Sequence, residues 1–258
     1  MRTGAIGIIG GSGLSGSAVF TVREEISTMT PWGAPSDALC VGSVDGVPVI
    51  QLSRHGRRHT IPPSQVNFRA NLQALKDAGC RCILATTAVG SLRRKIGRGH
   101  CVIPDQFIDF TKQRKMTFFE RFEPDKARHT PMAEPFDAAL RAALYEEASR
   151  LGLPRHNGGT VVTIEGPRFS TRAESRMFRL WGGDVINMST ATEATLAGEL
   201  DLPYAAVAMS TDYDAWNEEE EAVSWAQVLE VFNRNADNVV NILLGAIPRV
   251  AALYLFDL

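Results

Sequence analysis

Short apolar segments alternate along the chain with longer segments whose apolar residues recur at helical spacing. Ala5–Ile9 is an apolar run that stops at a glycine pair, and Phe68, Leu72 and Leu75 line one side of the later segment 67–78. Parallel strands need long crossover connections, which are usually helices, so this alternation is typical of a sheet covered on both faces. The pattern predicts an α/β fold: a three-layer αβα sandwich with a largely parallel sheet.

The same periodicities assign elements to the rest of the chain. Strands are expected at Ala5–Ile9, Val49–Leu52, Cys82–Val89, Thr160–Ile164, Asp184–Asn187 and Tyr204–Met209, and helices at Asn67–Ala78, Phe136–Leu151, Thr171–Trp181, Thr192–Leu200 and Trp225–Leu244. No linker rich in proline or serine and no internal repeat divides the sequence. Residues 1–258 are therefore expected to form a single domain.

Composition argues against several classes of protein. With 27 Lys+Arg against 29 Asp+Glu the formal net charge is −2, which offers no general attraction to nucleic acid or to an anionic membrane. No apolar run approaches the ~18 residues that a membrane helix needs, and the stretch Val250–Phe256 is expected to pack in the core or in a subunit interface. The four cysteines do not suggest a disulfide framework. We expect buried thiols of a cytoplasmic protein at Cys40, Cys80, Cys82 and Cys101.

A glycine-rich segment, GGSGLSG at residues 10–16, follows the first expected strand. Its small residues would let main-chain N–H groups and the Ser12 hydroxyl contact an anion. Its glycines also match the G-x-G-x-x-G of dinucleotide sites, which leaves an NAD-dependent oxidoreductase as an alternative. That motif lacks its usual context here, because no clean helix follows and Asp37 lies in a loop-like stretch. A tight turn that simply needs glycine is the third possibility.

A basic run follows the second expected strand. Three arginines and two histidines occupy positions 54–59 beside a glycine, and Arg54 and His55 come directly after the strand end. Arginine can hold a dianion through forked hydrogen bonds, so we expect anion binding here. A basic surface run without function is the plainer alternative, and a metal site at His55 and His59 lacks a convincing third ligand nearby.

Polar and aromatic residues follow the other expected strands. Thr87 and Ala88 offer a hydroxyl and main-chain amides to phosphate or sugar, and Phe169 can either stack on a flat ring or pack in the core. Asp212 and Asp214 follow the last strand, where both could face a ligand and one could donate a proton to a leaving group. Capping of a turn is the simpler role for such aspartates. Together these residues suit an enzyme that handles phosphate and a neutral heterocycle.

Eight longer segments carry a family resemblance. They are IGIIGGSGL (6–14), SRHGRRHTIPPSQVNFRANLQALK (53–76), TTAVGSL (86–92), VIPDQFIDFT (102–111), HTPMAEPF (129–136), TIEGPRFSTRAES (163–175), GGDVINMST (182–190) and STDYDAW (210–216). They resemble the S-methyl-5'-thioadenosine phosphorylases, in the trimeric branch of the purine nucleoside phosphorylase family. The resemblance implies a nucleoside phosphorylase fold with a mixed, mostly parallel sheet. It also implies a pentosyltransferase that converts 5'-methylthioadenosine and phosphate into adenine and 5-methylthioribose-1-phosphate, in purine and methionine salvage.

The resemblance also implies roles for individual residues. Six would bind the phosphate: Ser12, Arg54, His55, Thr87, Ala88 and Ser189. Eight would contact the nucleoside: Phe169, Met188, Asp212, Asp214, His129, Trp225, Val228 and Leu229. Asp212 and Asp214 would be the catalytic pair, with Asp212 on purine N7 as general acid and Asp214 accepting from the 6-amino group. Carboxylates repel a 6-oxo oxygen, so adenine nucleosides are favoured.

His129 would reach the 5' side of the sugar in a neighbouring subunit, which implies a homotrimer with shared sites and leaves a hexamer possible. Inorganic phosphate is the co-substrate, and no metal or organic cofactor is required. Adenine nucleosides and phosphate are the expected partners, without nucleic acid or membrane. A nucleoside-binding module without catalysis is a further alternative, and the intact phosphate-site and Asp212 positions argue against it.

Three departures from the family pattern leave the 5' substituent open. Trp225 stands where the family usually has a small aliphatic residue, so its indole would shrink the 5' pocket or pack against the thioether sulfur. Ala191-Thr192 replaces a pair that commonly contains proline, and the chain ends about ten residues after Pro248, before a segment that helps close the site in longer relatives. A phosphorylase for another 5'-modified adenine nucleoside, such as 5'-deoxyadenosine, or a broader purine nucleoside phosphorylase, is therefore the alternative.

Overall fold

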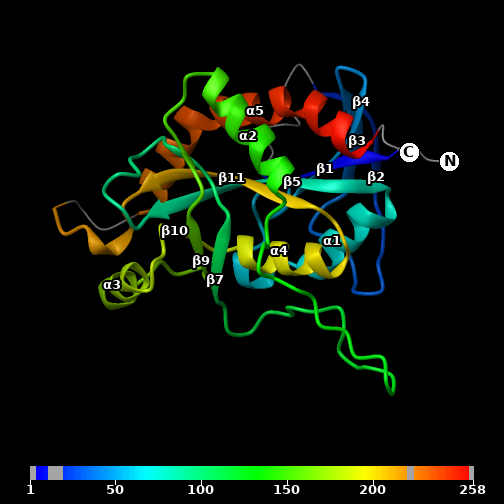
Figure 1. Ribbon diagram of the computed structural model, residues 1–258, viewed down its shortest axis with the longest axis horizontal. Coiled ribbons are helices and arrows are strands. Elements are labelled where there is room, and N and C mark those ends of the chain that lie inside the picture. The colour runs from blue at the N-terminus through cyan, green and yellow to red at the C-terminus, as the bar shows by residue number, and fades with distance from the viewer. Residues whose placement is uncertain (1–3, 11–19, 220–223, 256–258) are drawn as a thin grey trace.

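The computed structural model describes residues 4–10, 20–219 and 224–255, and an eleven-stranded sheet forms its centre (Figure 1). The strands are β1 (Ala5–Gly10), β2 (Thr21–Ile26), β3 (Leu39–Val44), β4 (Val47–Ser53), β5 (Cys80–Ser91), β6 (Cys101–Ile103), β7 (Gln106–Phe110), β8 (Arg155–Asn157), β9 (Thr160–Ile164), β10 (Val185–Asn187) and β11 (Tyr204–Asp212). The helices are α1 (Phe68–Asp77), α2 (Ala138–Arg150), α3 (Arg172–Leu180), α4 (Thr190–Glu199) and α5 (Trp225–Tyr254), with single 3-10 turns at Pro63–Gln65 and Asp214–Trp216.

The sheet is mixed and mostly parallel, as predicted. Its main path runs β2-β3-β4-β1-β5-β10-β9-β7, and β11 pairs with β5 and continues to β6 and β8. At the centre, β1 lies parallel to both β4 and β5, and β11 lies parallel to β5. The pairs β2–β3, β3–β4, β5–β10 and β6–β11 are antiparallel. The carboxyl ends of β1, β4, β5 and β11 therefore point the same way, which is where open α/β sheets bind ligands.

Helices cover both faces of this sheet and complete the three layers (Figure 1). The strand β1 shows how the layers are joined, because its successive side chains point to opposite faces. Ile6 and Ile8 enter a core with α2 and α5, whereas Ile9 enters a second core with α1 and α4. All four cysteines are free and buried, as expected from the sequence.

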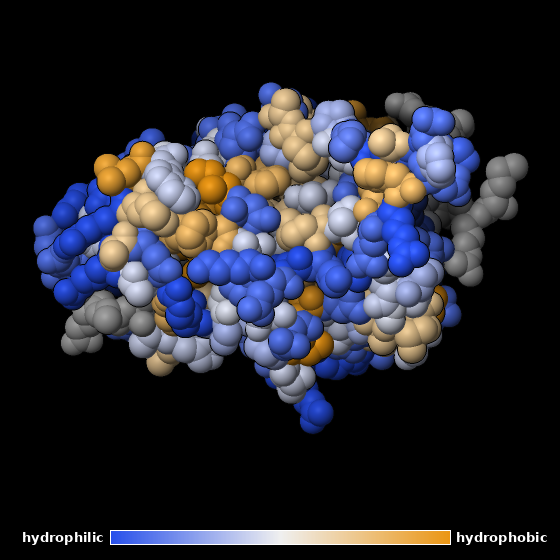
Figure 2. All heavy atoms as spheres, turned by 90° about the horizontal axis from the view of Figure 1, so that it is seen from below, coloured by the Kyte–Doolittle hydropathy of each residue, from blue (hydrophilic) through white to orange (hydrophobic). Residues whose placement is uncertain are grey.

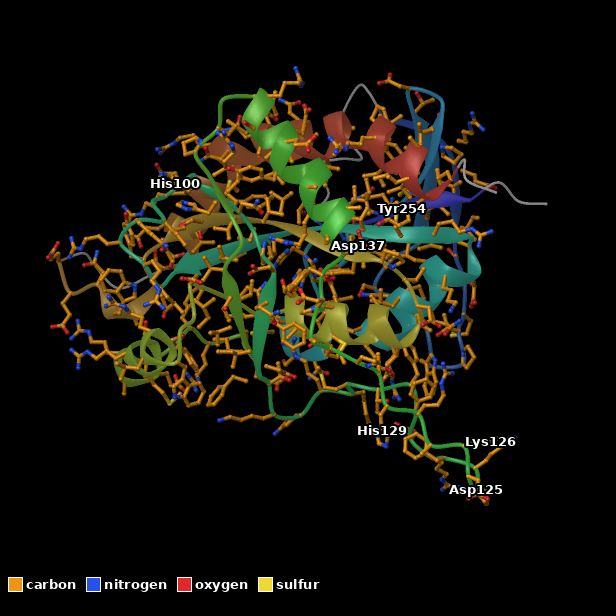
Figure 3. All side chains as sticks on the ribbon, viewed as in Figure 1. His100, Asp125, Lys126, His129, Asp137 and Tyr254 are labelled. Atoms are coloured by element: carbon orange, nitrogen blue, oxygen red, sulfur yellow. The ribbon has the colours of Figure 1, made fainter. Side chains whose placement is uncertain are left out.

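Local sequence signals account for where the helices begin. Asn67 caps α1 by accepting a hydrogen bond from the Ala70 N–H at 3.2 Å. Thr171 and Glu174 form a reciprocal capping box at the start of α3, as their spacing indicates. Asp137 caps the start of α2. It also accepts a hydrogen bond from the Tyr254 hydroxyl at 2.5 Å, which ties the end of α5 to α2 (Figure 3).

The six expected strands and five expected helices are all present, but five further strands are missing from the sequence prediction. The exposed edge strand β2 reads TVREEI, without the apolar pattern used to identify strands. Two others, β6 and β8, have only three residues each. Of the remaining two, β3 pairs with its neighbours in the antiparallel direction, and β7 lies at the edge of the main path of the sheet. The first described element after the glycine-rich segment is the strand β2, so among the described residues no helix follows that segment as a dinucleotide-binding site would need.

Helix α5 runs ten residues beyond the expected end at Leu244 and passes through Pro248. Pro248 lacks the N–H of a helix interior, but Ile247, Val250 and Ala251 around it are buried in the core and hold the helix in place. In the part of the chain that the structure describes, this is the one helix whose length and apolar composition would allow it to cross a membrane. Here its N-terminal half, up to Ala236, borders a cavity, and its C-terminal half packs against the sheet and α2.

The segment 111–135 forms an arm that leaves the body of the molecule on the side of α1 and α4 (Figure 1). Viewed from that side, apolar side chains gather over the part of the surface near α3 (Figure 2). Leu180 and Trp181, at the end of α3, are 87% and 50% exposed, and Phe122 on the arm is 47% exposed. Exposed apolar groups of this size suit contact with another molecule.

Candidate active site

A cavity of about 620 Å³ lies at the carboxyl ends of the central strands and against the N-terminal half of α5. Twelve of the fourteen predicted site residues line it: Arg54, His55, Thr87, Ala88, Phe169, Met188, Ser189, Asp212, Asp214, Trp225, Val228 and Leu229. Ser12 lies outside the described residues, although Gly10 before it lines the cavity. His129, the remaining predicted residue, lies on the arm (Figure 3) and does not line the cavity.

Arg54 is held rigidly at one end of the cavity. Its guanidinium forms a two-pronged ion pair with Glu193 of α4, at 2.5 Å and 2.9 Å, and donates to the Thr86 carbonyl at 2.9 Å. Tyr204 donates its hydroxyl to the same Glu193 at 2.8 Å. Burial by itself would lower the pKa of Arg54, but the Glu193 carboxylate raises it, so the guanidinium stays charged. A buried, fixed cation of this kind suits an anionic ligand.

His55 lies beside Arg54 as a neutral imidazole. Its Nδ1 is 2.9 Å from the Ile61 carbonyl, a contact that requires Nδ1 to carry the proton and leaves Nε2 as an acceptor. Burial, with a smaller contribution from the Arg54 charge, lowers the pKa of His55 to about 4. The residue can therefore accept a hydrogen bond from a protonated ligand oxygen at neutral pH.

The prediction that the whole basic run 54–59 clamps an anion is too broad. Arg57 lines the cavity, but its guanidinium forms exposed ion pairs with Glu25 and Asp37. Asp37, considered above for a dinucleotide site, is thus engaged with Arg57. Counting charges in the sequence did not reveal that these acidic residues pair with Arg57, because Glu25 comes from β2, a strand that the sequence did not predict.

Asp212 is the last residue of β11, and Asp214 begins the 3-10 turn that follows it; both line the cavity. The Asp214 N–H donates to Asp212 Oδ1 at 2.8 Å, and the Thr211 hydroxyl donates to Asp212 Oδ2 at 2.7 Å. Burial nevertheless raises the pKa of Asp212 to about 6. An aspartate with such a pKa can hold and release a proton near neutral pH.

Burial also raises the pKa of Asp214, although the nearby hydroxyls of Ser175 and Ser170 oppose the shift. Its Oδ2 atom is buried and has no well-aligned hydrogen-bond partner among the described residues. A buried acceptor without a partner carries a free-energy cost that a donor on a ligand would relieve. Asp214 is therefore suited to accept from an amino group placed in the cavity.

Apolar side chains line the rest of the cavity. Phe169 is 36% exposed, which fits a stacking surface better than the alternative of core packing. Met188 approaches Gly166 so closely that a Cβ there would lie 2.4 Å from its sulfur, and Gly166 has a φ of +67°. Gly166 is therefore needed both for its backbone conformation and for the position of Met188.

Trp225 stands at the first position of α5, with Val228 and Leu229 on the following turn. Its ring lies 5.4 Å from that of His59, whose ring lies 4.6 Å from that of His55. The three rings connect the Arg54 end of the cavity to its α5 wall. No two-histidine metal site is indicated, since the described residues hold no group of three or more His, Cys, Asp and Glu placed to bind a metal ion.

Three residues of the site were not predicted to have a role. Glu193 and Asn187 are buried polar residues that contact Arg54 and Thr87, respectively. Gly90 of β5 lets Asp212 approach, because a Cβ there would lie 2.9 Å from Asp212 Oδ1. For Asn187 a signal was available, since an amide that ends an otherwise apolar strand is unusual.

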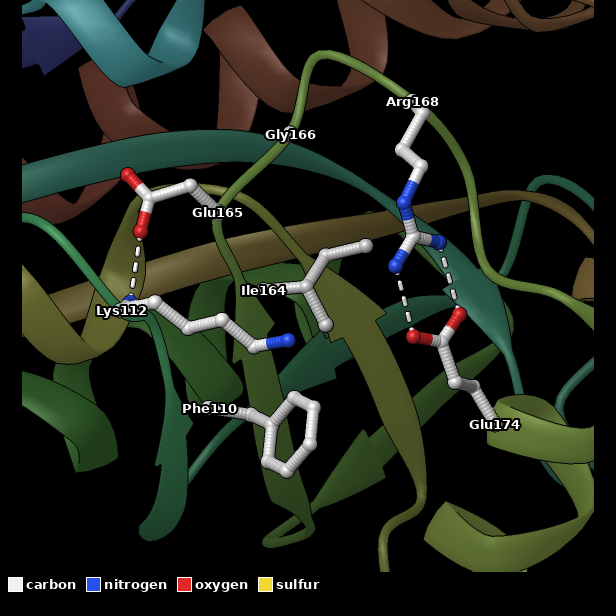
Figure 4. Close-up of a pocket in the computed structure, with 7 residues that line it drawn as sticks. All are labelled: Phe110, Lys112, Ile164, Glu165, Gly166, Arg168 and Glu174. Carbon is white, nitrogen blue, oxygen red and sulfur yellow. Dashed lines mark hydrogen bonds and ion pairs between the residues drawn. The ribbon is translucent and has the colours of Figure 1, made fainter.

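A second, small cavity of about 40 Å³ lies beside the loop that carries Phe169 (Figure 4). Arg168 and Glu174 pair across it with two contacts of 2.7 Å, and Glu165 accepts from the Lys112 N–H at 2.6 Å. These contacts fix the loop 165–169 on both sides of Gly166. The small cavity thus belongs to the support of the Phe169 loop.

Comparisons with known proteins identify the family of this chain. The model of the phosphorylase superfamily matches residues 5–248. The S-methyl-5'-thioadenosine phosphorylases of Xenopus tropicalis and Danio rerio are 53% and 52% identical, and each alignment covers 96% of this chain and 89% of the relative.

Solved structures give the same result. Methylthioadenosine phosphorylase from Schistosoma mansoni with adenine has a TM-score of 0.90 at 42% identity, over 96% of this chain and 92% of that one. A variant of the adenosine/methylthioadenosine phosphorylase from the same organism, in complex with methylthioadenosine, has a TM-score of 0.89 at 40% identity, with the same coverage. The chain belongs to the phosphorylase superfamily and, within it, to the family of the S-methyl-5'-thioadenosine phosphorylases.

Proposed function

We propose that this chain cleaves 5'-methylthioadenosine with inorganic phosphate, giving adenine and 5-methylthioribose-1-phosphate. The observation that carries the proposal is that one cavity joins a fixed cation, Arg54, to a buried carboxyl with a raised pKa, Asp212. The activity named for the relatives and the methylthioadenosine bound by the Schistosoma mansoni variant support the same substrate.

The reaction assigns the two ends of the cavity to two developing charges. A phosphate oxygen forms a bond to C1' of the ribose while the bond from C1' to N9 of adenine breaks and leaves its electron pair on the purine. Phosphate held by Arg54, His55 and Thr87 stabilises the positive ribosyl group, and Asp212 donates its proton to N7 of the departing base. Asp214 accepts from the 6-amino group, which selects adenine over 6-oxopurines.

The proposal includes no metal ion and no organic cofactor, because phosphate is the second substrate and proton donation from Asp212 supplies the acid catalysis. We also propose a cytoplasmic enzyme of purine and methionine salvage. Four free, buried cysteines suit a reducing compartment.

The first experiment measures adenine release from 5'-methylthioadenosine, adenosine and 5'-deoxyadenosine, each with and without phosphate. Release that requires phosphate and is fastest on the methylthio compound supports the proposal. Release without phosphate would instead indicate a hydrolase and remove the phosphate role of Arg54 and His55. Fastest release from 5'-deoxyadenosine would keep the mechanism and change the substrate.

Trp225 should restrict the 5' substituent. Replacing Trp225 with valine removes an indole from the α5 wall, and kcat/KM for adenine nucleosides with bulky 5' thioethers should rise by about tenfold or more. The matched control is Trp181→Val, because Trp181 is also 50% exposed but lies on α3. An unchanged substrate profile in the Trp225 variant would show that this side chain does not border the 5' group.

We propose a homotrimer in which the arm completes a neighbouring site. His129 lies on this arm against Phe122, with ring centroids 5.8 Å apart, and it does not line the cavity of its own chain (Figure 3). Light scattering should give the mass of three chains, or of six if trimers pair. Co-refolding His129→Ala with Asp212→Asn should give more activity than the two variants separately, because mixed trimers regain complete sites. Activity equal to their sum would place His129 outside the site.

A further inference from the structure

Asn187, the last residue of β10, lies between the phosphate end of the cavity and the N-terminus of α4. It is 6% exposed, and its amide contacts side chains from three elements. Its nitrogen donates to Thr87 Oγ1 at 3.1 Å and to Thr190 Oγ1 at 2.5 Å, and its oxygen accepts from Thr163 Oγ1 at 2.9 Å. The sequence analysis gave this residue no role beyond the end of a strand.

The surroundings of Asn187 determine which amide atom is the oxygen. The main-chain N–H groups of Ser189 and Thr190 approach Oδ1 at 3.4 Å and 3.5 Å, and such groups can only donate. The Thr163 hydroxyl receives a hydrogen bond from the Ala191 N–H at 3.0 Å, so its own proton is directed to the same oxygen. Oδ1 therefore faces three donors, and the amide nitrogen must face Thr87.

This arrangement gives the hydrogen bonds one direction. They run from the Ala191 N–H through the Thr163 hydroxyl to Asn187, and from the Asn187 amide to Thr87 Oγ1. Because the Thr87 oxygen already accepts from Asn187, the Thr87 proton is turned away from Asn187. It is donated to the main-chain carbonyl of the next residue, Ala88, at 3.1 Å, which is a weak local contact. A ligand oxygen in the cavity can readily take it over.

We infer that Asn187 is a positioning residue that holds the Thr87 hydroxyl as a donor toward phosphate. The inference rests on the proposed function, since it assigns the anion end of the cavity to phosphate. Asn187 and Glu193 then act in parallel: Glu193 orients the charged donor Arg54, and Asn187 orients a neutral donor. Without the amide, the hydroxyl of Thr87 is free to turn and to present its lone pairs, which repel an anion.

The test is a double-mutant cycle between Asn187→Leu and Thr87→Val, read as the KM for phosphate at saturating nucleoside. Each single change should raise this KM by about tenfold, the scale of one hydrogen bond. The double variant should be no worse than the poorer single one, because both changes remove the same donor. The KM for 5'-methylthioadenosine should change by less than about threefold, since a loss confined to one donor affects only the ligand it contacts.

Asn71→Leu is the matched control, because Asn71 is also buried and donates to a hydroxyl, Ser36 Oγ at 3.0 Å, away from the cavity. It should leave the KM for phosphate unchanged. If the effects of Asn187→Leu and Thr87→Val multiply, or if Asn187→Leu does not alter the KM, the inference is wrong. Wild-type protein without phosphate-dependent adenine release would instead overturn the proposed function itself.

If Asn187→Leu does not fold, Asn187→Asp keeps the shape of the side chain. An ionised carboxylate accepts from Thr87 instead of donating, whereas its protonated form can donate. The KM for phosphate of this variant, divided by the wild-type value at the same pH, should therefore rise with pH. A ratio that does not depend on pH would contradict the inference.

Discussion

Replacing Asp212 with asparagine should lower kcat/KM for 5'-methylthioadenosine by about 10²- to 10⁴-fold, the usual contribution of a general acid. Asparagine keeps the shape of the side chain and can hydrogen-bond N7, but it has no proton to transfer. Inosine-type nucleosides should lose less, because an uncharged amide at position 212 leaves Asp214 as the one carboxylate of this pair that repels their 6-oxo group. The measurement is initial-rate phosphorolysis of both substrate classes, with the exposed Asp109→Asn as control.

The pH profile provides an independent check on the same residue. Burial raises the pKa of Asp212 to about 6, so its acid form is abundant below that pH and is lost above it. The kcat/KM of the wild-type protein should therefore fall as pH rises through about 6, and this descending limb should be absent in Asp212→Asn. Equal losses on adenine and inosine nucleosides would show that Asp212 does not help to select the 6-amino group, and an unchanged pH profile would show that it is not the acid.

Replacing Glu193 with glutamine should destabilise the protein by about 3–5 kcal/mol, because it leaves the buried Arg54 charge without its counter-ion. The side chains of Arg54 and Glu193 are only 5% and 1% exposed, so water cannot compensate. The amide nitrogen of glutamine would also face an N–H of the guanidinium. The urea midpoint should fall, and the KM for phosphate should rise because Arg54 is no longer fixed.

Glu230→Gln is the control for this change, since Glu230 pairs with Arg234 on the exposed side of α5, where both side chains are more than two-thirds exposed. A surface pair of this kind contributes about 0–1 kcal/mol. Similar unfolding midpoints for the two variants would mean that the buried pair contributes little and that another contact positions Arg54.

The sequence predicted the central strands, all five helices and the edge of the sheet where the cavity lies, because these depend on local periodicity. It did not predict contacts between residues far apart in the chain. Arg54 and Glu193 are 139 positions apart, and no local pattern identifies the acidic partner. The antiparallel strand β2 was missed for a related reason: four of its six residues are polar and five are exposed, so it is a strand because it pairs with β3.

The family resemblance supplied what periodicity could not, namely a role for each residue at the strand ends. Geometry then separated residues that look alike in the sequence. Arg54 and Arg57 are three positions apart, yet Arg54 is buried against Glu193, whereas Arg57 forms ion pairs at the exposed surface. Burial also distinguishes Asp212 from the exposed aspartates, because desolvation raises its pKa.

The division of α5 into two halves bears on how this family can change its substrates. In the first half, residues on one side of the helix, up to Ala236, line the cavity, whereas the buried residues from Val239 onward belong to the hydrophobic core. Substitutions at exposed positions of the first half, such as Trp225, cost little stability, whereas changes in the second half disturb packing. Under the proposed assignment of Trp225 to the 5' group, new 5' preferences can therefore arise from substitutions in the first turns of one helix, while the rest of the same helix remains constrained by folding.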